Sequence, residues 1–151
     1  MKKILLCFLL LSCFGCVTVK MPKYLKDEFP YQKKFYASYD DTLTATMDAL
    51  KGLGWEISET SHPSVFEHGQ LSEAEGARQI LIFTEIRQTP LFLSSRYMSL
   101  NVYVRMAGNE STDVEIRYVS VTPMLFKNSQ SYKNEGVVQN VFDRISELLN
   151  Q

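Results

Sequence analysis

Cysteine is almost absent from this sequence outside one short stretch. Three cysteines occur among 151 residues, and all of them, Cys7, Cys13 and Cys16, lie within the first sixteen. A disulfide framework and a cysteine-based zinc site are therefore excluded from the rest of the chain. An excess of one charge is lacking too, because sixteen basic residues face seventeen acidic ones. Without a basic excess, we expect no nucleic-acid partner.

Motifs of known catalytic or cofactor chemistry are also lacking. The sequence contains no Gly-x-Ser-x-Gly motif, phosphate-binding loop or dinucleotide fingerprint. Its two histidines, His62 and His68, are six residues apart, which is a poor spacing for sharing one metal ion. A carboxylate pair would need an acid from residues 40–48 to meet Glu85 or Glu115, and such acids usually cap helices or face water. We therefore expect no enzymatic activity, no cofactor and no metal site.

The first fifteen residues have the layout of a secretory signal peptide. Met1–Lys3 is a short basic start, and Ile4–Leu11 is a continuous apolar run. This run is far shorter than the roughly 20 apolar residues that span a bilayer as a helix. We therefore predict a cleaved signal peptide over residues 1–15 rather than a transmembrane anchor.

The end of this segment resembles a bacterial lipobox, at which a lipoprotein signal peptidase cleaves just before a lipidated cysteine. Gly15 precedes Cys16, which is our preferred lipidation site. Cys13, with Leu10 three places before it and Ser12 directly before it, is the alternative site. The resemblance implies a membrane partner bound through N-terminal acyl chains, since two or more chains anchor a protein stably. A soluble secreted protein is the remaining alternative.

Residues 16–34 are predicted to be the lipidated N-terminus and a flexible leash. The segment 17–34 contains two prolines and five lysines, and it has no sustained helical or strand period. Val17 stands where many inner-membrane lipoproteins of enterobacteria have an aspartate. The lipoprotein resemblance therefore implies a periplasm-facing location that favours the outer membrane over the inner one.

Residues 35–151 are predicted to form a single α+β domain. Strands are expected at 35–38, 55–58, 79–88, 97–106 and 111–121, with an optional strand between 65 and 71. Ser38 and Asp41 predict the start of a helix that Gly52 or Gly54 ends. An apolar stripe predicts a second helix from 136 to 150; it consists of Val138, Val141, Phe142, Ile145, Leu148 and Leu149.

Because alternating strands and striped helices each need a buried face, we expect an antiparallel sheet of four to five strands with two helices packed on one face. The expected order is strand, helix, strand, optional strand, three strands and helix. From Phe35 to Leu149 this order, with Ser38 to Asp41 and Gly54-Trp55 as local features, resembles the helix-grip domains of the BamC lipoprotein in the outer-membrane barrel-assembly machinery. The resemblance implies a non-enzymatic, envelope-facing module.

Two loops carry large apolar residues where turns are usually polar. Each begins with Thr-Pro, and the apolar residues that follow are Leu91, Phe92 and Leu93 in the first loop and Met124, Leu125 and Phe126 in the second. Because the last three strands form a meander, both loops are expected at one end of the sheet. Arg96, Lys127 and Lys133 lie just after them. We interpret these six residues as a contact for a partner protein, a lipid or the bilayer; the alternative is that they fold inward and close the core.

These observations favour a membrane-anchored lipoprotein that acts as a non-catalytic binding or scaffold module in the bacterial cell envelope, with an envelope protein as a candidate partner. The alternative is a lipid or small-ligand carrier with a pocket between the C-terminal helix and the sheet. The residues expected to line that pocket are Tyr97, Tyr103, Tyr118, Phe83 and Phe142.

Overall fold

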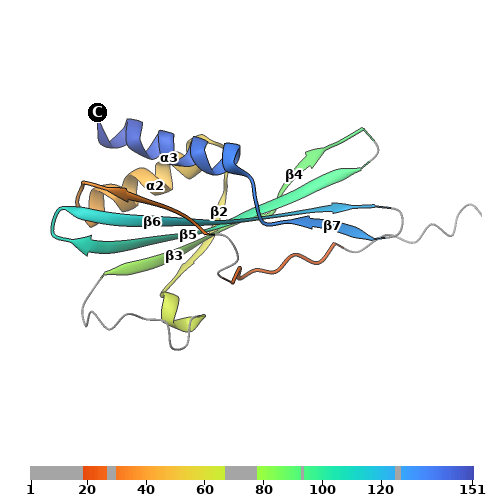
Figure 1. The fold of residues 1–151 in the computed structure, drawn as a ribbon, viewed down its shortest axis with the longest axis horizontal. Coiled ribbons are helices and arrows are strands. Elements are labelled where there is room, and N and C mark those ends of the chain that lie inside the picture. Colours follow the sequence, from red (N-terminus) through yellow and green to blue (C-terminus); the bar gives the residue numbers. More distant parts are fainter. Residues whose placement is uncertain (1–18, 27–29, 67–77, 93, 125–126) are drawn as a thin grey trace, which may run out of the picture.

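The protein has an α+β fold, which we describe from a computed structural model covering residues 19–26, 30–66, 78–92, 94–124 and 127–151 (Figure 1). Its elements are β1 (Tyr31–Phe35), α2 (Tyr39–Gly52), β2 (Ile57–Ser61), the 3-10 helix η1 (Pro63–Val65), β3 (Gln79–Thr84), β4 (Arg87–Pro90), β5 (Ser95–Gly108), β6 (Ser111–Pro123), β7 (Asn128–Ser131) and α3 (Glu135–Leu149). The expected signal peptide, Cys13 and Cys16 lie outside the described residues.

A seven-stranded antiparallel sheet forms the centre of the fold. Five strands follow in the order β1-β6-β5-β3-β2, while β4 pairs with β5 and β7 pairs with β6. The predicted α+β class with two helices is confirmed, but the expected four to five strands are too few. The strand expected over 79–88 is divided at Glu85 and Ile86 into β3 and β4. The sequence of β7, Asn-Ser-Gln-Ser, has no apolar alternation that could have indicated a strand.

Both helices cover the same face of the sheet, as predicted (Figure 1). Their apolar stripes pack on alternate residues of the strands, because successive side chains of a strand point to opposite faces. The buried core on this face includes Ala49, Leu50, Ile82, Leu100, Val102, Val104, Val114, Ile116, Val138, Val141, Phe142 and Ile145. Trp55 and Tyr118 complete it. This single core holds both helices against the sheet.

Helix α2 is capped at both ends by residues that the sequence indicates. The Ser38 hydroxyl accepts a hydrogen bond from the Asp41 backbone N–H at 3.2 Å. At the other end, Gly54 adopts a positive φ of 77°. Its N–H donates to the Lys51 carbonyl at 2.9 Å, and the Trp55 N–H donates to the Leu50 carbonyl at 2.9 Å. This pair of bonds is a Schellman motif, so Gly54 rather than Gly52 is the residue that turns the chain out of the helix.

The N-terminal boundary of the folded part lies earlier than the sequence indicates. Tyr31–Lys34, part of the expected leash, pair with β6 as most of β1. Leu25, also in the expected leash, is 2% exposed. Because lysines and prolines are frequent in this segment, its few apolar residues form no pattern that predicts their docking on the domain. The expected domain start at residue 35 is therefore too late, and the expected strand over 35–38 lies at Tyr31–Phe35 instead.

The two buried threonines of α2 give a matched test of hydrogen bonding inside the core. Both Thr42 and Thr46 are 0% exposed. The Thr46 hydroxyl donates to the Thr42 carbonyl at 2.7 Å, whereas the Thr42 hydroxyl has no hydrogen-bond partner. Thr42→Val is expected to raise the free energy of unfolding by about 1 kcal/mol, because a buried unpaired hydroxyl is replaced by a methyl group.

The matched variant Thr46→Val is expected to act in the opposite direction. It removes a formed hydrogen bond, which costs about 0.5–1.5 kcal/mol. Urea unfolding of both variants, followed by the fluorescence of the single tryptophan, measures the difference. Equal changes of the same sign would contradict the different surroundings of the two hydroxyls.

Candidate functional site

The sheet continues beyond the helices as a four-stranded extension made by β4, β5, β6 and β7 (Figure 1). We call residues 87–99 and 118–134 the distal arm. Within it the start of β5 pairs with the end of β6, with Tyr97 opposite Val121. The turn before β5 and the turn after β6 therefore lie at the same end of the sheet. This confirms the expectation that both Thr-Pro loops share one end.

The two turns of the distal arm are built alike. Each follows the proline that ends β4 or β6. In the first turn the Leu91 N–H donates to the Ser94 carbonyl at 2.8 Å. In the second, the Met124 N–H donates to the Lys127 carbonyl at 3.0 Å. The repeated Thr-Pro pattern of the sequence thus corresponds to a repeated hairpin, which presents the residues after each proline at its end.

The described apolar residues of the two turns point into solvent. Phe92 is 98% exposed, Met124 54% and Leu91 40%. We call these three residues the tip. Of the six contact residues expected from the sequence, Leu93, Leu125 and Phe126 lie outside the described residues. For the tip itself, the alternative in which the loops fold inward to close the core does not hold. Exposed apolar side chains in two turns at the same end of a sheet are a candidate contact surface.

Two basic residues lie next to the tip, and no acidic residue lies within the distal arm. The distal arm contains four basic residues and no aspartate or glutamate, while the other twelve basic and all seventeen acidic residues lie elsewhere in the chain. Arg96 and Lys127, both exposed, lie next to the tip. Arg87 and Lys133 lie at the base, where Arg87 stacks over Trp55 at 5.4 Å. The near-neutral net charge of the sequence conceals this local positive charge.

The second face of the sheet, opposite the helices, is crossed by residues 21–25, which we call the strap (Figure 1). Asn101 on β5 fixes its backbone, because its Oδ1 accepts from the Leu25 N–H at 2.7 Å and its Nδ2 donates to the Lys23 carbonyl at 3.1 Å. Tyr24 stacks on Phe66 with ring centroids 5.2 Å apart. The segment following the expected lipidation site is therefore bound to the domain.

A buried ion pair lies beneath the strap. Arg117 and Glu115 on β6 are 3% and 6% exposed, and their Nε and Oε1 atoms are 2.6 Å apart. The Arg117 Nη1 donates to the Leu25 carbonyl at 2.8 Å and to the Tyr24 and Tyr103 hydroxyls at 3.2 Å each. Burial by itself lowers the pKa of Arg117, but the opposing Glu115 carboxylate and the tyrosine oxygens outweigh it and raise that pKa. Arg117 is thus a permanent cation that ties the strap to the sheet.

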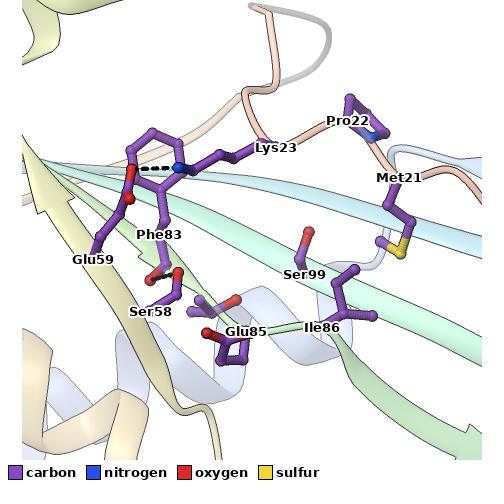
Figure 2. A pocket seen from close by; sticks show the side chains of 10 residues that line it. Met21, Pro22, Lys23, Ser58, Glu59, Phe83, Glu85, Ile86 and Ser99 are labelled. Atoms are coloured by element: carbon purple, nitrogen blue, oxygen red, sulfur yellow. Dashed lines mark hydrogen bonds and ion pairs between the residues drawn. The ribbon is translucent and has the colours of Figure 1, made fainter.

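A cavity of about 380 Å³ lies beside the strap (Figure 2). It is lined by Met21, Pro22, Lys23, Ser58, Glu59, Phe83, Thr84, Glu85, Ile86 and Ser99. Figure 2 shows Lys23 reaching across Phe83 to Glu59, where the ion pair measures 2.8 Å. Lys23 lies 5.6 Å from the Phe83 ring centroid. These contacts hold the strap at one wall of the cavity.

The ligand pocket expected between the C-terminal helix and the sheet is not formed by its expected residues. Phe83 and Tyr103 belong to an apolar cluster on the strap face. Tyr118 and Phe142 belong to the core on the helix face. Because residues of different parity on a strand point to opposite faces, these side chains cannot line one pocket. Four of the five residues expected to line that pocket are thus divided between the two faces of the sheet.

Two of the acids considered for a catalytic pair, Asp40 and Glu115, have separate structural partners. Both terminal guanidinium nitrogens of Arg78 donate to the Asp40 carboxylate, at 2.6 and 2.7 Å, and this hydrogen bonding lowers the pKa of the Asp40 carboxyl. Glu115 lies on the other face, where it pairs with Arg117. His62 caps η1 and lies 2.7 Å from the Ser64 hydroxyl, while the other histidine is outside the described residues. Within the described ranges, no three His, Cys, Asp or Glu side chains are grouped to hold a metal ion.

Comparison with known proteins adds no relative. No family model matches the chain, and no curated protein is similar to it in sequence. Among the described residues, no helix combines the length and apolar character needed to cross a membrane.

Proposed function

We propose that this protein is a lipid-anchored, non-catalytic binding module of the bacterial cell envelope, which faces the periplasm from the outer membrane. The observation that carries the proposal is the tip, where Phe92 is 98% exposed next to Leu91 in one turn and Met124 is 54% exposed in the turn at the same end of the sheet. Exposed large apolar side chains in neighbouring turns at one end of a sheet are a candidate contact surface. The lipobox resemblance at Cys16 supplies the anchor, and the BamC-like order of elements agrees with an envelope-facing module.

The arrangement of polar groups supports binding rather than catalysis. Asp40 is engaged by Arg78 on the edge of α2, and Glu115 is engaged by Arg117 under the strap. Both carboxylates thus have structural partners on separate faces of the sheet, and neither meets a second acid. The ion pair of Glu115 and Arg117 secures the strap, which joins the expected anchor to the domain.

Lipidation tests the proposal directly. In a Gram-negative host supplied with an alkyne-labelled fatty acid, the wild-type protein is expected to become labelled. Cys16→Ala is expected to lose the label, because it removes the thiol that receives the lipid. Cys13→Ala is the matched control and is expected to keep it. Separating the two membranes by density then shows whether the labelled protein follows the outer membrane.

Two outcomes would change this view in different ways. Label retained in Cys16→Ala and lost in Cys13→Ala would move the site to Cys13. Absence of label from the wild type would remove the lipid anchor and the proposed function with it.

A further inference from the structure

We propose that the tip inserts into the anionic bilayer that holds the acyl chains, so that the domain contacts the membrane at two points. The inference rests on the proposed function, because lipidation at Cys16 decides which membrane is near. Its structural basis is independent of lipidation and has three parts: the exposure of the tip, the charge of the distal arm and the direction of the strap.

The exposure of the tip suits shallow insertion. Phe92, Leu91 and Met124 stand at the ends of two paired hairpins, beyond the region covered by the helices. A hairpin end can enter the interface without breaking backbone pairing, since the turn bonds of Leu91 and Met124 are made within each turn. Apolar side chains gain free energy by burial in the headgroup and acyl boundary.

The charge of the distal arm selects an anionic surface. Arg96 and Lys127 lie next to the tip, and no acidic residue occurs in the arm to oppose them. Basic residues close to a membrane are attracted by anionic headgroups over roughly one Debye length. The acidic residues all lie elsewhere in the chain, and anionic headgroups repel them. The electrostatic field of the membrane therefore favours an orientation with the arm toward the bilayer. Binding of the tip in a groove of a protein partner would not require the basic residues of the arm to be separated from the acidic residues of the chain.

The strap leads toward the tip as it runs back toward Cys16. Leu25 is bonded to Asn101, whereas Met21, four residues earlier, lines the cavity with Ser99 and Ile86 (Figure 2). Since β5 runs away from the tip, the move from Asn101 to Ser99 is a move toward it. Within the strap, the direction from Leu25 back to Met21 is therefore toward the end of the molecule where Phe92 lies.

The remaining chain is long enough to place the anchor level with the tip. Five peptide units separate Cys16 from Met21, and five residues can span at most about 18 Å. Four residues of β5 separate Ser99 from Ser95 at the turn, which is about 13 Å along a strand. Acyl chains on Cys16 and the ring of Phe92 can therefore enter the same leaflet.

Vesicle binding by the full mature chain carrying Cys16→Ser tests the inference, because this chain has no acyl anchor. We expect it to bind vesicles of phosphatidylglycerol and phosphatidylethanolamine, to bind phosphatidylcholine vesicles less, and to dissociate as salt is raised. Adding Phe92→Ser should weaken binding at least about tenfold, since the burial of one large apolar side chain is lost. Its thermal midpoint should stay unchanged, because Phe92 is 98% exposed.

Tyr36→Ser is the matched control. Tyr36 is 88% exposed but follows β1, whose Phe35 pairs with Thr112 near the far end of the β5–β6 hairpin. This variant should bind as the parent does. Equal loss of binding in Tyr36→Ser and Phe92→Ser, or no binding of the parent to any vesicle, would overturn the inference and leave a protein partner for the tip.

A second measurement reports insertion itself. Phe92→Trp places a fluorophore at the tip, whereas the natural Trp55 is buried at 3% exposure. Brominated acyl chains are expected to quench Phe92→Trp and to leave Tyr36→Trp unquenched. Absence of quenching would overturn insertion even if vesicles bind. The lipid-labelling experiment separates the two proposals, because Cys16 can be lipidated whether or not the tip enters the bilayer.

Discussion

Phe142→Ala is expected to lower the free energy of unfolding by about 3–5 kcal/mol, as truncation of a buried phenylalanine does. Phe142 is 5% exposed on α3. Its ring lies 6.3 Å from the Phe35 ring of β1, between centroids, and the Lys33 Nζ lies 5.9 Å from its centre. Truncation leaves a cavity between helix and sheet, and the fixed strands cannot close around it. Urea unfolding followed through Trp55 measures the loss.

Asp143→Ala is the control for that variant. Asp143 is the next residue of α3, is exposed, and accepts one hydrogen bond from Gln139. Its replacement is expected to change the free energy of unfolding by less than about 0.5 kcal/mol. A loss below roughly 1 kcal/mol in Phe142→Ala would mean that α3 is not docked as described.

The elements with strong local patterns could be predicted from the sequence. The apolar stripe of α3 and the alternation in β5 and β6 each repeat over many residues, so a single residue that departs from the pattern does not obscure it. The helix end was predicted at Gly52 or Gly54, and the structure selects Gly54, which has the positive φ that a side chain resists. Short elements without a periodic pattern could not be predicted from the sequence. β7 has four polar, exposed residues, and its pairing with β6 supplies what its sequence does not.

The burial of Glu115 and Arg117 could not be predicted from alternation. Their positions on β6 mark them as facing away from the helices, and a polar face normally meets water. What buries them is the strap, whose contacts join residues 76 to 93 positions apart. The only local signal was the pair Tyr24-Leu25 within a lysine-rich segment. A short docked segment offers too few residues for a pattern to emerge.

The location of the tip could be predicted, but its exposure could not. A meander places alternate turns at one end whatever their sequence, so the repeated Thr-Pro pattern was sufficient for location. Whether an apolar turn faces water or core depends on how far the strands extend past the helices, which the helix lengths alone do not define. The lack of acids in the distal arm was present in the sequence, but the two segments become one surface only in the fold.

Arg117→Met is expected to destabilise the protein by about 3–5 kcal/mol, because it leaves Glu115 buried without its main counter-charge. Gln32 and Arg105 remain near the carboxylate, at 3.0 and 3.6 Å, but Arg105 is itself partly exposed. The change also removes the donor to the Leu25 carbonyl, so the strap should loosen. Trypsin should then cut after Lys23 faster than in the wild type, where Asn101 and Arg117 hold the flanking backbone.

Adding Glu115→Leu to Arg117→Met separates the two consequences. With both charges gone, the free energy of unfolding should recover in part, since an apolar pair has no desolvation penalty. Cleavage after Lys23 should stay fast, because the bond to the Leu25 carbonyl is still missing. Arg96→Met, at an exposed arginine of the distal arm, should change neither quantity. If Arg117→Met instead unfolds like the wild type and keeps Lys23 protected, the ion pair does not secure the strap.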